Sequence, residues 1–153
     1  REKVAGRTIV STTTNGTRAL RACATAKATL LGSFLNLRAT VSYLAEQKAD
    51  QLVLVCSGTQ EEAAYEDVLA AGALCDQVWN LYAEGQVSDS AQIARTLYRQ
   101  GQQDLFGAMQ HSRNARHLLA NPDLCEDVNL CLQRDTVSIV AGLNRNGTVK
   151  GLS

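Results

Sequence analysis

The sequence predicts an α/β fold, a mostly parallel sheet covered by helices in a three-layer arrangement. Apolar, β-branched segments alternate along the chain with segments that have helical periodicity, which is the pattern of strand–helix–strand units. Residues 51–56 contain the continuous apolar run Leu-Val-Leu-Val, which is typical of a strand buried on both faces of a parallel sheet. In such folds ligands bind at the carboxyl ends of the strands.

The strands and helices are predicted from two different periodicities. Short runs of β-branched and apolar residues predict strands at residues 7–13, 29–32, 51–56 and 136–141. Apolar residues at helical spacing predict helices at residues 18–28, 36–48, 61–80, 88–100, 104–119 and 121–132. The last helix is expected to begin at Asn121 as its N-cap, with Pro122 at the first helical position.

Composition favours one globular domain over residues 1–153. The chain has a single proline and no segment with the composition of a linker. Lys and Arg number 15, as do Asp and Glu, so no general positive field favours nucleic acid or an acidic membrane as a partner. No apolar run is long enough to span a bilayer. The expected ligand is therefore a small molecule held by local groups.

Two further features concern the chain ends and the cysteines. The sequence opens with Arg1 rather than Met, at the approach to a predicted strand, so we expect more chain in front and an incomplete domain here. The exposed sheet edges of such a domain predict association, with a homodimer as the expected assembly.

The five cysteines are odd in number and form no Cys-x-x-Cys pair, which favours free thiols in a reducing, cytoplasmic location over a zinc site.

A hydroxyl-rich segment between the first predicted strand and helix is the first candidate site. It consists of Thr13, Thr14, Asn15, Gly16 and Thr17. Hydroxyls, backbone N–H groups and the helix dipole can together bind a phosphate or sulfonate oxygen. It is not a P-loop, because the Gly-Lys-Ser/Thr ending is missing. The structural alternative is an Asn-Gly turn in which Thr17 caps the helix.

Carboxylates after residues 51–56 form the second candidate site. Glu61 and Glu62 are explained by attraction to the helix N-terminus. Glu66 and Asp67 lie one turn deeper, next to an apolar face, and a carboxylate pair there predicts a Mg²⁺ site. The alternative for this pair is again stabilisation of a helix start. Asn36 is expected to be either a helix N-cap or a ligand contact.

At these residues the sequence resembles the 2-phosphosulfolactate phosphatase family. Three stretches carry the resemblance: residues 11–20, similar to the family's Thr-Thr-Asn-Gly-Thr segment; residues 31–36, similar to its Gly-Ser-Phe-x-Asn segment; and residues 65–73, similar to its Glu-Asp-x-x-x-Ala-Gly segment. Their order and separation also fit the family, and together they are more specific than any one of them.

The resemblance implies a Mg²⁺-dependent hydrolase. The implied reaction cleaves the phosphate ester of 2-phospho-3-sulfolactate to sulfolactate and phosphate, a step of coenzyme M biosynthesis in methanogens. It also implies that this chain is the C-terminal portion of a longer enzyme, because the family's N-terminal Asp-x-x-Arg-Ala-Thr and Gly-Glu-Arg segments are not found here. Those segments are expected to supply active-site groups, so the catalytic residues stay unknown and the chain alone is expected to be inactive.

The alternative function is of another class. The same residues are compatible with a non-catalytic, Rossmann-like module that binds a small anionic metabolite or mediates oligomerisation. This alternative accounts for the missing segments, and it does not require Glu66 and Asp67 to lie near the hydroxyl-rich segment.

Overall fold

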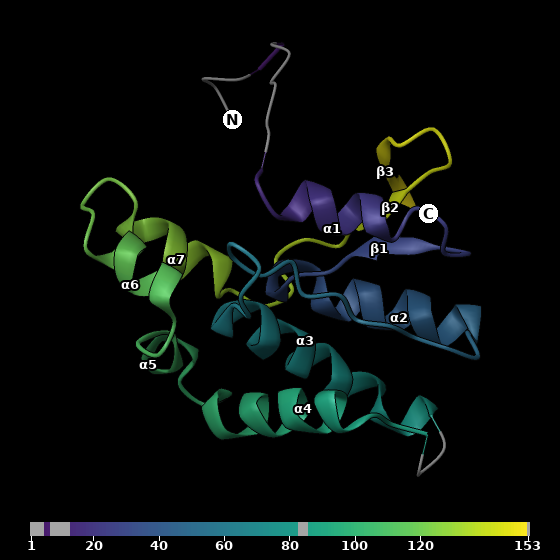
Figure 1. Cartoon of the computed structure of the whole chain (residues 1–153), viewed down its shortest axis with the longest axis horizontal. Helices are drawn as coiled ribbons and strands as arrows, with labels where there is room; N and C mark the ends of the chain where they lie inside the picture. Colours follow the sequence, from purple (N-terminus) through teal and green to yellow (C-terminus); the bar gives the residue numbers. More distant parts are fainter. Residues whose placement is uncertain (1–4, 7–12, 83–85, 153) are drawn as a thin grey trace.

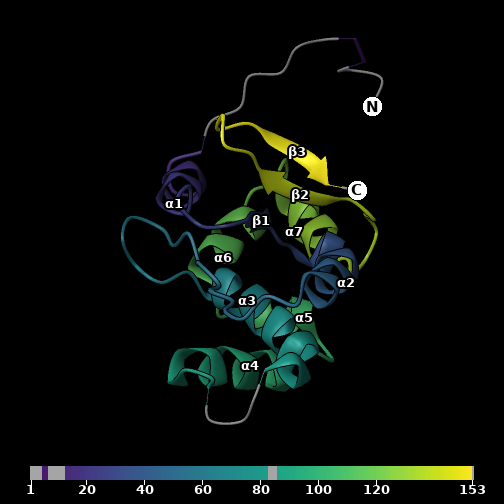
Figure 2. The ribbon, with the colours of Figure 1, turned by 90° about the vertical axis from the view of Figure 1, so that its right-hand side faces the viewer.

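Helices make up most of the fold, and a small antiparallel sheet lies on one side of them (Figures 1 and 2). The computed structural model describes residues 5–6, 13–82 and 86–152. The α-helices are α1 Gly16–Ala22, α2 Leu37–Gln47, α3 Tyr65–Val78, α4 Asp89–Gly101, α5 Leu105–Met109, α6 Arg113–Leu119 and α7 Cys125–Cys131. The 3₁₀ turns are η2 Phe34–Asn36 and η3 Trp79–Leu81, and the strands are β1 Thr29–Leu31, β2 Val140–Leu143 and β3 Val149–Leu152.

The predicted parallel, three-layer sheet is wrong. The three strands lie in the order β1-β2-β3, and both pairs are antiparallel, with Leu30 opposite Gly142 and Gly142 opposite Lys150. A local turn enforces one of these pairings: the Asn144 side chain accepts hydrogen bonds from the backbone N–H groups of Asn146 and Thr148. A tight hairpin of this kind can join only antiparallel strands.

The strand predicted at residues 51–56 is not found: in the described part of the chain this segment has no regular secondary structure. Its inward side chains, Leu52 and Leu54, pack against the helical core. Its outward side chains, Val53 and Val55, are 69% and 54% exposed, so the expected burial on both faces is also wrong. The apolar run was therefore misleading about the local structure, since these residues form no strand in the described part of the chain. The predicted strand at residues 7–13 lies almost wholly outside the described residues.

Capping side chains set several helix boundaries that periodicity did not predict. The helix expected at residues 104–119 divides into α5 and α6, because Ser112 accepts a hydrogen bond from the N–H of Ala115 and starts a new helix. The helix expected to start after Asn121 begins only at Cys125, following a turn.

No helix in the described ranges is long and apolar enough to cross a membrane.

The hydrophobic core includes side chains of α2, α3 and α4. Figure 2 shows the sheet at one end of the fold and α4 at the other, with α3 between them. Leu69, on α3, is completely buried at its centre, and Leu37, on α2, is 2% exposed. The Phe34 and Tyr98 rings meet in this core with their centroids 6.4 Å apart. α3 is therefore the central helix, and its N-terminal end can be held rigidly by the packing behind it.

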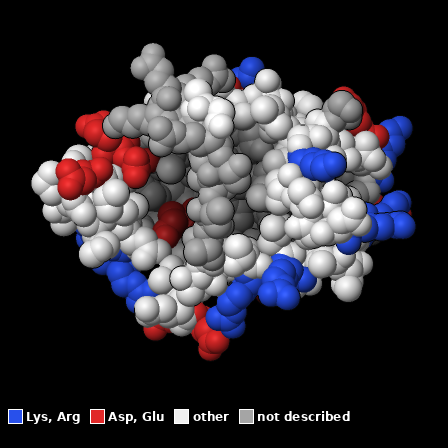
Figure 3. Space-filling view, turned by 90° about the horizontal axis from the view of Figure 1, so that it is seen from above, with Lys and Arg blue, Asp and Glu red and all other residues white. Residues whose placement is uncertain are grey.

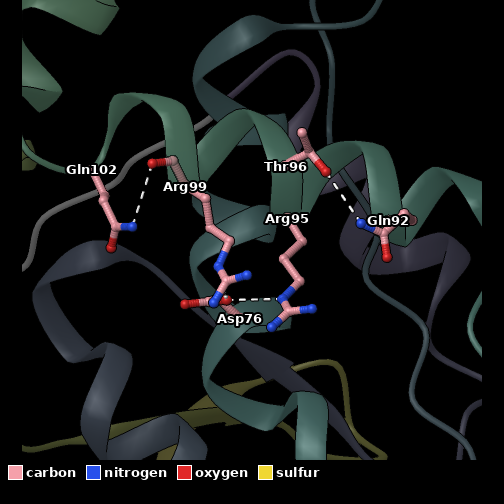
Figure 4. A network of polar contacts seen from close by, with 6 residues as sticks. All are labelled: Asp76, Gln92, Arg95, Thr96, Arg99 and Gln102. Carbon is pink, nitrogen blue, oxygen red and sulfur yellow. Dashed lines mark hydrogen bonds and ion pairs between the residues drawn. The ribbon is translucent and has the colours of Figure 1, made fainter. Parts of the chain in front are cut away.

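Charged side chains hold α4 against α3 (Figure 4). Asp76 on α3 accepts a hydrogen bond from Nε of Arg95 at 2.8 Å and forms an ion pair with Arg99, whose Nε lies 3.0 Å from the same oxygen. Arg95 also lies over the Trp79 ring, with its Cζ atom 4.0 Å from the ring centroid. Because Asp76 and Arg95 are largely buried, this contact is more than a solvent-screened surface pair. It fixes the register of the two helices.

The α3–α4 packing also depends on a glycine, which provides a stability test. A Cβ atom at Gly72 would collide with the carbonyl oxygen of Ala94 and with the Cβ of Tyr98, so Gly72→Ala must push the helices apart. We expect Gly72→Ala to lower the free energy of unfolding by about 2 kcal/mol or more in denaturant titrations. Gly32→Ala is the control, since its new Cβ meets nothing closer than 3.9 Å. Equal stability of the two variants would contradict the packing described here.

Candidate functional site

A tight turn precedes α3 and carries backbone strain. The N–H of Thr59 donates to the carbonyl oxygen of Glu62, and the N–H of Glu62 donates back to that of Thr59. The two residues at its tip, Gln60 and Glu61, have φ angles of 52° and 68°. Such a two-residue turn favours Asn or Gly at its tip, so residues with long side chains there are strained. Strain of this kind is often found where a loop has a function.

Asp67, in the first turn of α3, anchors the start of this loop. One of its oxygens, Oδ2, accepts a hydrogen bond from the backbone N–H of Gly58 at 2.8 Å and another from the Ser57 hydroxyl at 3.1 Å. Gly58 has a φ angle of 68°, which only glycine adopts without strain. Within the described part of the chain, no donor contacts the other oxygen, Oδ1, so that oxygen is available to a ligand.

Glu66 is held at both of its oxygens by α6. The Ser112 hydroxyl donates to Oε2 at 2.7 Å, and the Asn114 amide donates to Oε1 at 2.6 Å. The same amide nitrogen also donates to the Thr59 hydroxyl at 2.7 Å, so Asn114 bridges α3 and the strained turn. Each carboxylate oxygen can accept two hydrogen bonds. Glu66 is therefore oriented and keeps lone pairs for a further partner.

The pKa of Glu66 lies below its ordinary value. Partial burial alone would raise this pKa, but the hydrogen bonds from Asn114 and Ser112 and the nearby charge of Arg113 outweigh it. Arg113 also pairs with Glu62 at 2.7 Å. Glu66 is thus ionised at neutral pH, as a cation ligand or a charge-stabilising group must be.

The hydroxyl-rich segment forms the start of α1. Thr13 acts as the capping side chain: its Oγ1 accepts a hydrogen bond from the N–H of Thr17 at 3.1 Å, and the Thr17 hydroxyl donates to the carbonyl oxygen of Thr13 at 2.7 Å. The predicted cap, Thr17, is therefore not the capping residue: the N-cap position is Asn15, whose side chain makes no capping hydrogen bond, and Thr13 takes this role instead. Thr14 and Gly16 are exposed and Asn15 is half-buried. The exposed groups remain available to a ligand.

The strained turn lies between the hydroxyl-rich segment and the acidic pair. On one side, Arg18 of α1 contacts Glu61 at the tip of the turn, with Nη2 and Oε1 3.3 Å apart. On the other side, Thr59 contacts Asn114, which binds Glu66. The Arg18–Glu61 pair is exposed, so it contributes little to stability. The pair matters for the arrangement of the site, because it shows that the start of α1 lies beside the turn that precedes Glu66 and Asp67.

Asn36 has a different place from the other predicted site residues. It is 7% exposed, and its amide nitrogen donates to the carbonyl oxygens of Leu31 and Ile139 while its oxygen accepts from Ser33. These bonds join β1 to the segment that leads into β2. The second family-like stretch, residues 31–36, therefore supports the sheet, and Asn36 has no side-chain group left for a ligand in this arrangement.

Sequence reasoning missed the residues that orient the acids. Ser112 and Asn114 lie 46 and 48 positions after Glu66, so no local spacing connects them. Ser112 carries a signal only as a helix N-cap. Its complete burial, with the hydroxyl aimed at Glu66, emerges from the break between α5 and α6.

The donors at this site suit a hard cation such as Mg²⁺. Mg²⁺ is usually bound through one or two carboxylates, retained waters and substrate phosphates, rather than by a complete protein cage. Glu66 and Asp67 are consecutive in the first turn of α3, so their side chains leave the helix about 100° apart and each offers a cation only part of its ligands. The described residues contain no group of three or more His, Cys, Asp or Glu that could hold a metal ion. The fit is thus to a shared site, in which other oxygens complete the coordination.

Other surface features do not compete with this site. A hollow of about 480 Å³, lined by residues that include Leu44 and Tyr82, lies at the far end of α3 from the acids. On the face seen in Figure 3, acidic side chains gather at the end of the molecule where α6 and α7 lie, and basic side chains are spread along the other edges. No single-sign surface dominates this face, in agreement with the balanced composition.

Comparison with known proteins identifies the family. A sequence model of 2-phosphosulpholactate phosphatase matches residues 1–146. The chain belongs to the 2-phosphosulpholactate phosphatase family. One relative, a probable 2-phosphosulfolactate phosphatase of Caldanaerobacter subterraneus subsp. tengcongensis, is 36% identical over 149 residues, covering 97% of this chain and 60% of the relative. The resemblance found in the sequence motifs is therefore confirmed.

Further members of the 2-phosphosulpholactate phosphatase family match in the same way. A probable 2-phosphosulfolactate phosphatase of Picosynechococcus sp. is 34% identical, covering 97% of this chain and 61% of the relative. Another, of Pseudothermotoga lettingae, is 38% identical, covering 86% and 55%. The chain thus spans about three-fifths of the length of the curated relatives it matches.

The strained turn can be relaxed by substitution. Gln60→Asn combined with Glu61→Gly places residues that tolerate a positive φ at both tip positions, so we expect the free energy of unfolding to rise by about 1–2 kcal/mol. The control is Glu61→Ala, which removes the contact with Arg18 but keeps a Cβ atom and should bring no gain. Denaturant titration of the three proteins decides: a double variant no more stable than the control would mean that the turn is unstrained.

The lowered pKa of Glu66 links stability to pH. Its favourable contacts with the charged form stabilise the fold above the pKa of the unfolded state and are lost as pH falls through the lower pKa of the folded state. We expect the stability advantage of the wild type over Glu66→Gln to be full at neutral pH and to shrink below about pH 5. The exposed Glu46→Gln is the matched control in urea titrations across this range. An advantage that grows on acidification would contradict the assignment.

Proposed function

We propose that this chain supplies the phosphate-binding segment and two metal-ligating carboxylates of a Mg²⁺-dependent phosphatase. The proposed reaction is the hydrolysis of 2-phospho-3-sulfolactate to sulfolactate and inorganic phosphate. The observation that carries the proposal is the strained turn, which contacts Arg18 at the start of α1 on one side and, through Asn114, Glu66 on the other. Family membership supports the same reaction class, because the relatives are named as probable phosphatases for this substrate.

The proposed phosphate-binding groups lie at the start of α1. Thr13 and Thr17 hold the bend in place through their mutual hydrogen bonds. Thr14, Asn15 and Gly16 then present a hydroxyl, an amide and backbone groups toward phosphate or sulfonate oxygens. Fixed donors of this kind stabilise the charge that builds on the transferring phosphoryl group, because they need no reorganisation when the reaction occurs.

The proposed metal-binding groups lie at the start of α3. Among the described residues Oδ1 of Asp67 has no donor while Oδ2 holds the loop, and Glu66 is kept ionised and oriented by Ser112 and Asn114. Bound there, Mg²⁺ would neutralise negative charge on the phosphate and help to orient it. Asn36 acts in this proposal through the sheet, by fixing β1 against the segment before β2.

The attacking group is proposed to lie in family sequence that this chain does not span. The chain covers about three-fifths of its relatives, so they contain further polypeptide that can contribute to the same site. The complete site would then combine the cradle at α1, the acids of α3 and the added groups. Phosphatase activity is accordingly a property that we propose for the full-length protein.

The test is a charge-removing substitution in a protein that carries this chain at full family length. Asp67→Asn keeps a carbonyl oxygen for the Gly58 N–H, so the loop stays in place while the charge is lost. We expect Mg²⁺-dependent phosphate release from 2-phospho-3-sulfolactate to fall on the order of 100-fold, with Mg²⁺ binding weakened in calorimetry.

The matched control for this test is Asp89→Asn, an exposed aspartate on α4 that should leave both readings unchanged. Normal turnover of Asp67→Asn would remove Asp67 from the metal site. No phosphatase activity with or without Mg²⁺ in the unmodified full-length protein would instead favour a non-catalytic module that binds an anionic metabolite.

A further inference from the structure

Two arginines from different helices contact the turn that precedes α3. Nη2 of Arg18, on α1, lies 3.3 Å from Oε1 of Glu61, and Nη1 of Arg113, on α6, lies 2.7 Å from Oε2 of Glu62. Figure 2 shows the loop before α3 on the side of the fold where α1 and α6 lie. Glu61 and Glu62 are consecutive, so helices that are distant in the sequence bring two guanidinium groups to one short turn.

Arg113 is also placed beside the acids of α3. Its charge helps to lower the pKa of Glu66. The next residue of α6, Asn114, donates hydrogen bonds to Glu66 and to Thr59, so this part of α6 is held against both the acid and the turn. The position of Arg113 is therefore set by the contacts of its neighbour and does not depend on its own ion pair with Glu62.

Both ion pairs are exposed to solvent and can be exchanged for a ligand. The side chains of Arg18 and Glu61 are 66% and 80% exposed, and those of Arg113 and Glu62 are 56% and 67% exposed. Such pairs contribute little to stability, because water screens the charges and ordering two long side chains costs entropy. The planar fork of donors on a guanidinium group fits a carboxylate or a similar oxyanion of a ligand equally well.

The proposed substrate has anionic groups that need such partners. Besides its phosphate it carries a carboxylate and a sulfonate, whereas the α1 bend and the metal are proposed to bind the phosphate. The carboxylates of Glu61, Glu62, Glu66 and Asp67 would repel these two further groups unless cations faced them. Arg18 and Arg113 are cations that the described fold brings to this place.

We propose that Arg113 and Arg18 bind the carboxylate and sulfonate groups of the substrate, and that Glu62 and Glu61 hold these guanidinium groups until the substrate displaces them. The inference rests on the proposed function for the identity of the ligand. It adds two residues that determine substrate specificity and an internal contact that competes with binding. A carboxylate and a sulfonate offer a guanidinium group the same chemistry, so ligands that lack one or the other are needed to tell which arginine binds which group.

The experiment measures binding by calorimetry in the protein at full family length, with Mg²⁺ present. The ligands are sulfolactate, which has both groups, lactate, which lacks the sulfonate, and 2-hydroxypropane-1-sulfonate, which lacks the carboxylate. We expect Arg113→Gln and Arg18→Gln each to weaken sulfolactate binding about tenfold, because each removes a charge-assisted contact. The smaller ligand whose affinity a substitution leaves unchanged lacks the group that this arginine binds.

The matched control is Arg38→Gln. Arg38 is an exposed arginine that forms an ion pair with Asp135 rather than with a residue of the turn. We expect this variant to bind sulfolactate as the unmodified protein does.

Removing the competing carboxylate should have the opposite effect. Glu62→Gln frees Arg113 while the backbone bonds between Glu62 and Thr59 remain, so we expect sulfolactate to bind about two- to fivefold more tightly. The gain should disappear when Glu62→Gln is combined with Arg113→Gln, because no guanidinium group is then released. A gain of the same size in both backgrounds would mean a general effect of charge and not an exchange of partners.

Four outcomes would overturn the proposal. The first is that the unmodified protein does not bind sulfolactate, and the second is equal affinity of the Arg113, Arg18 and Arg38 variants. The third is weaker binding by Glu62→Gln, as expected of a purely structural pair, and the fourth is an equal gain with and without Arg113. None of these readings requires turnover. Absence of phosphatase activity would therefore overturn the functional proposal, while the calorimetry still decides this one.

Discussion

The candidate site depends on how a carboxylate at the start of α3 holds the loop in front of it. Asp67 accepts the N–H of Gly58 and the hydroxyl of Ser57, and this bond turns the chain sharply at the N-terminal end of a helix that is rigid in the core. Charge-assisted hydrogen bonds to a backbone N–H are among the stronger ones in proteins. Without the bonds of Asp67 to Gly58 and Ser57, the turn that contacts both Arg18 and Asn114 would have no fixed position.

The turn at residues 59–62 has a strained backbone, and strain of this kind is often found at functional loops. Gln60 and Glu61 both have positive φ angles, although Asn or Gly would relieve the strain. Asn114 reaches from α6 to both Thr59 and Glu66, so the strained tip and the acid share one amide group. The position of the turn relative to Glu66 is therefore fixed through this one side chain.

The sequence predicted individual elements and motifs better than their pairing. The residues of α2, α3 and α4 follow from helical spacing, because their apolar faces pack on one core. The predicted parallel sheet was wrong. The hairpin at Asn144 makes β2 and β3 antiparallel. In addition, Val53 and Val55 are exposed in the described part of the chain, although the apolar run at residues 51–56 predicted a strand buried on both faces. Periodicity carries no information about a partner segment.

The same division holds for the site. Glu66 and Asp67 could be chosen as candidates because two carboxylates stand beside an apolar run, and the Asn15–Gly16 bend because hydroxyls cluster at a helix start. Ser112 and Asn114 could not be found, since their partner lies 46 or more positions away and only tertiary packing brings them together. Asn36 was found as a motif residue, but its contacts place it in the sheet.

The central claim, that the α1 bend and the α3 acids face a common ligand, can be measured directly by paramagnetic relaxation. Mn²⁺, added in place of Mg²⁺ to the ¹⁵N-labelled protein at full family length with inorganic phosphate present, broadens only amide signals near the bound ion. We expect the amides of Asn15 and Gly16 to broaden together with those of Glu66 and Asp67. Broadening at the acids that leaves Asn15 and Gly16 sharp would contradict this account of the site.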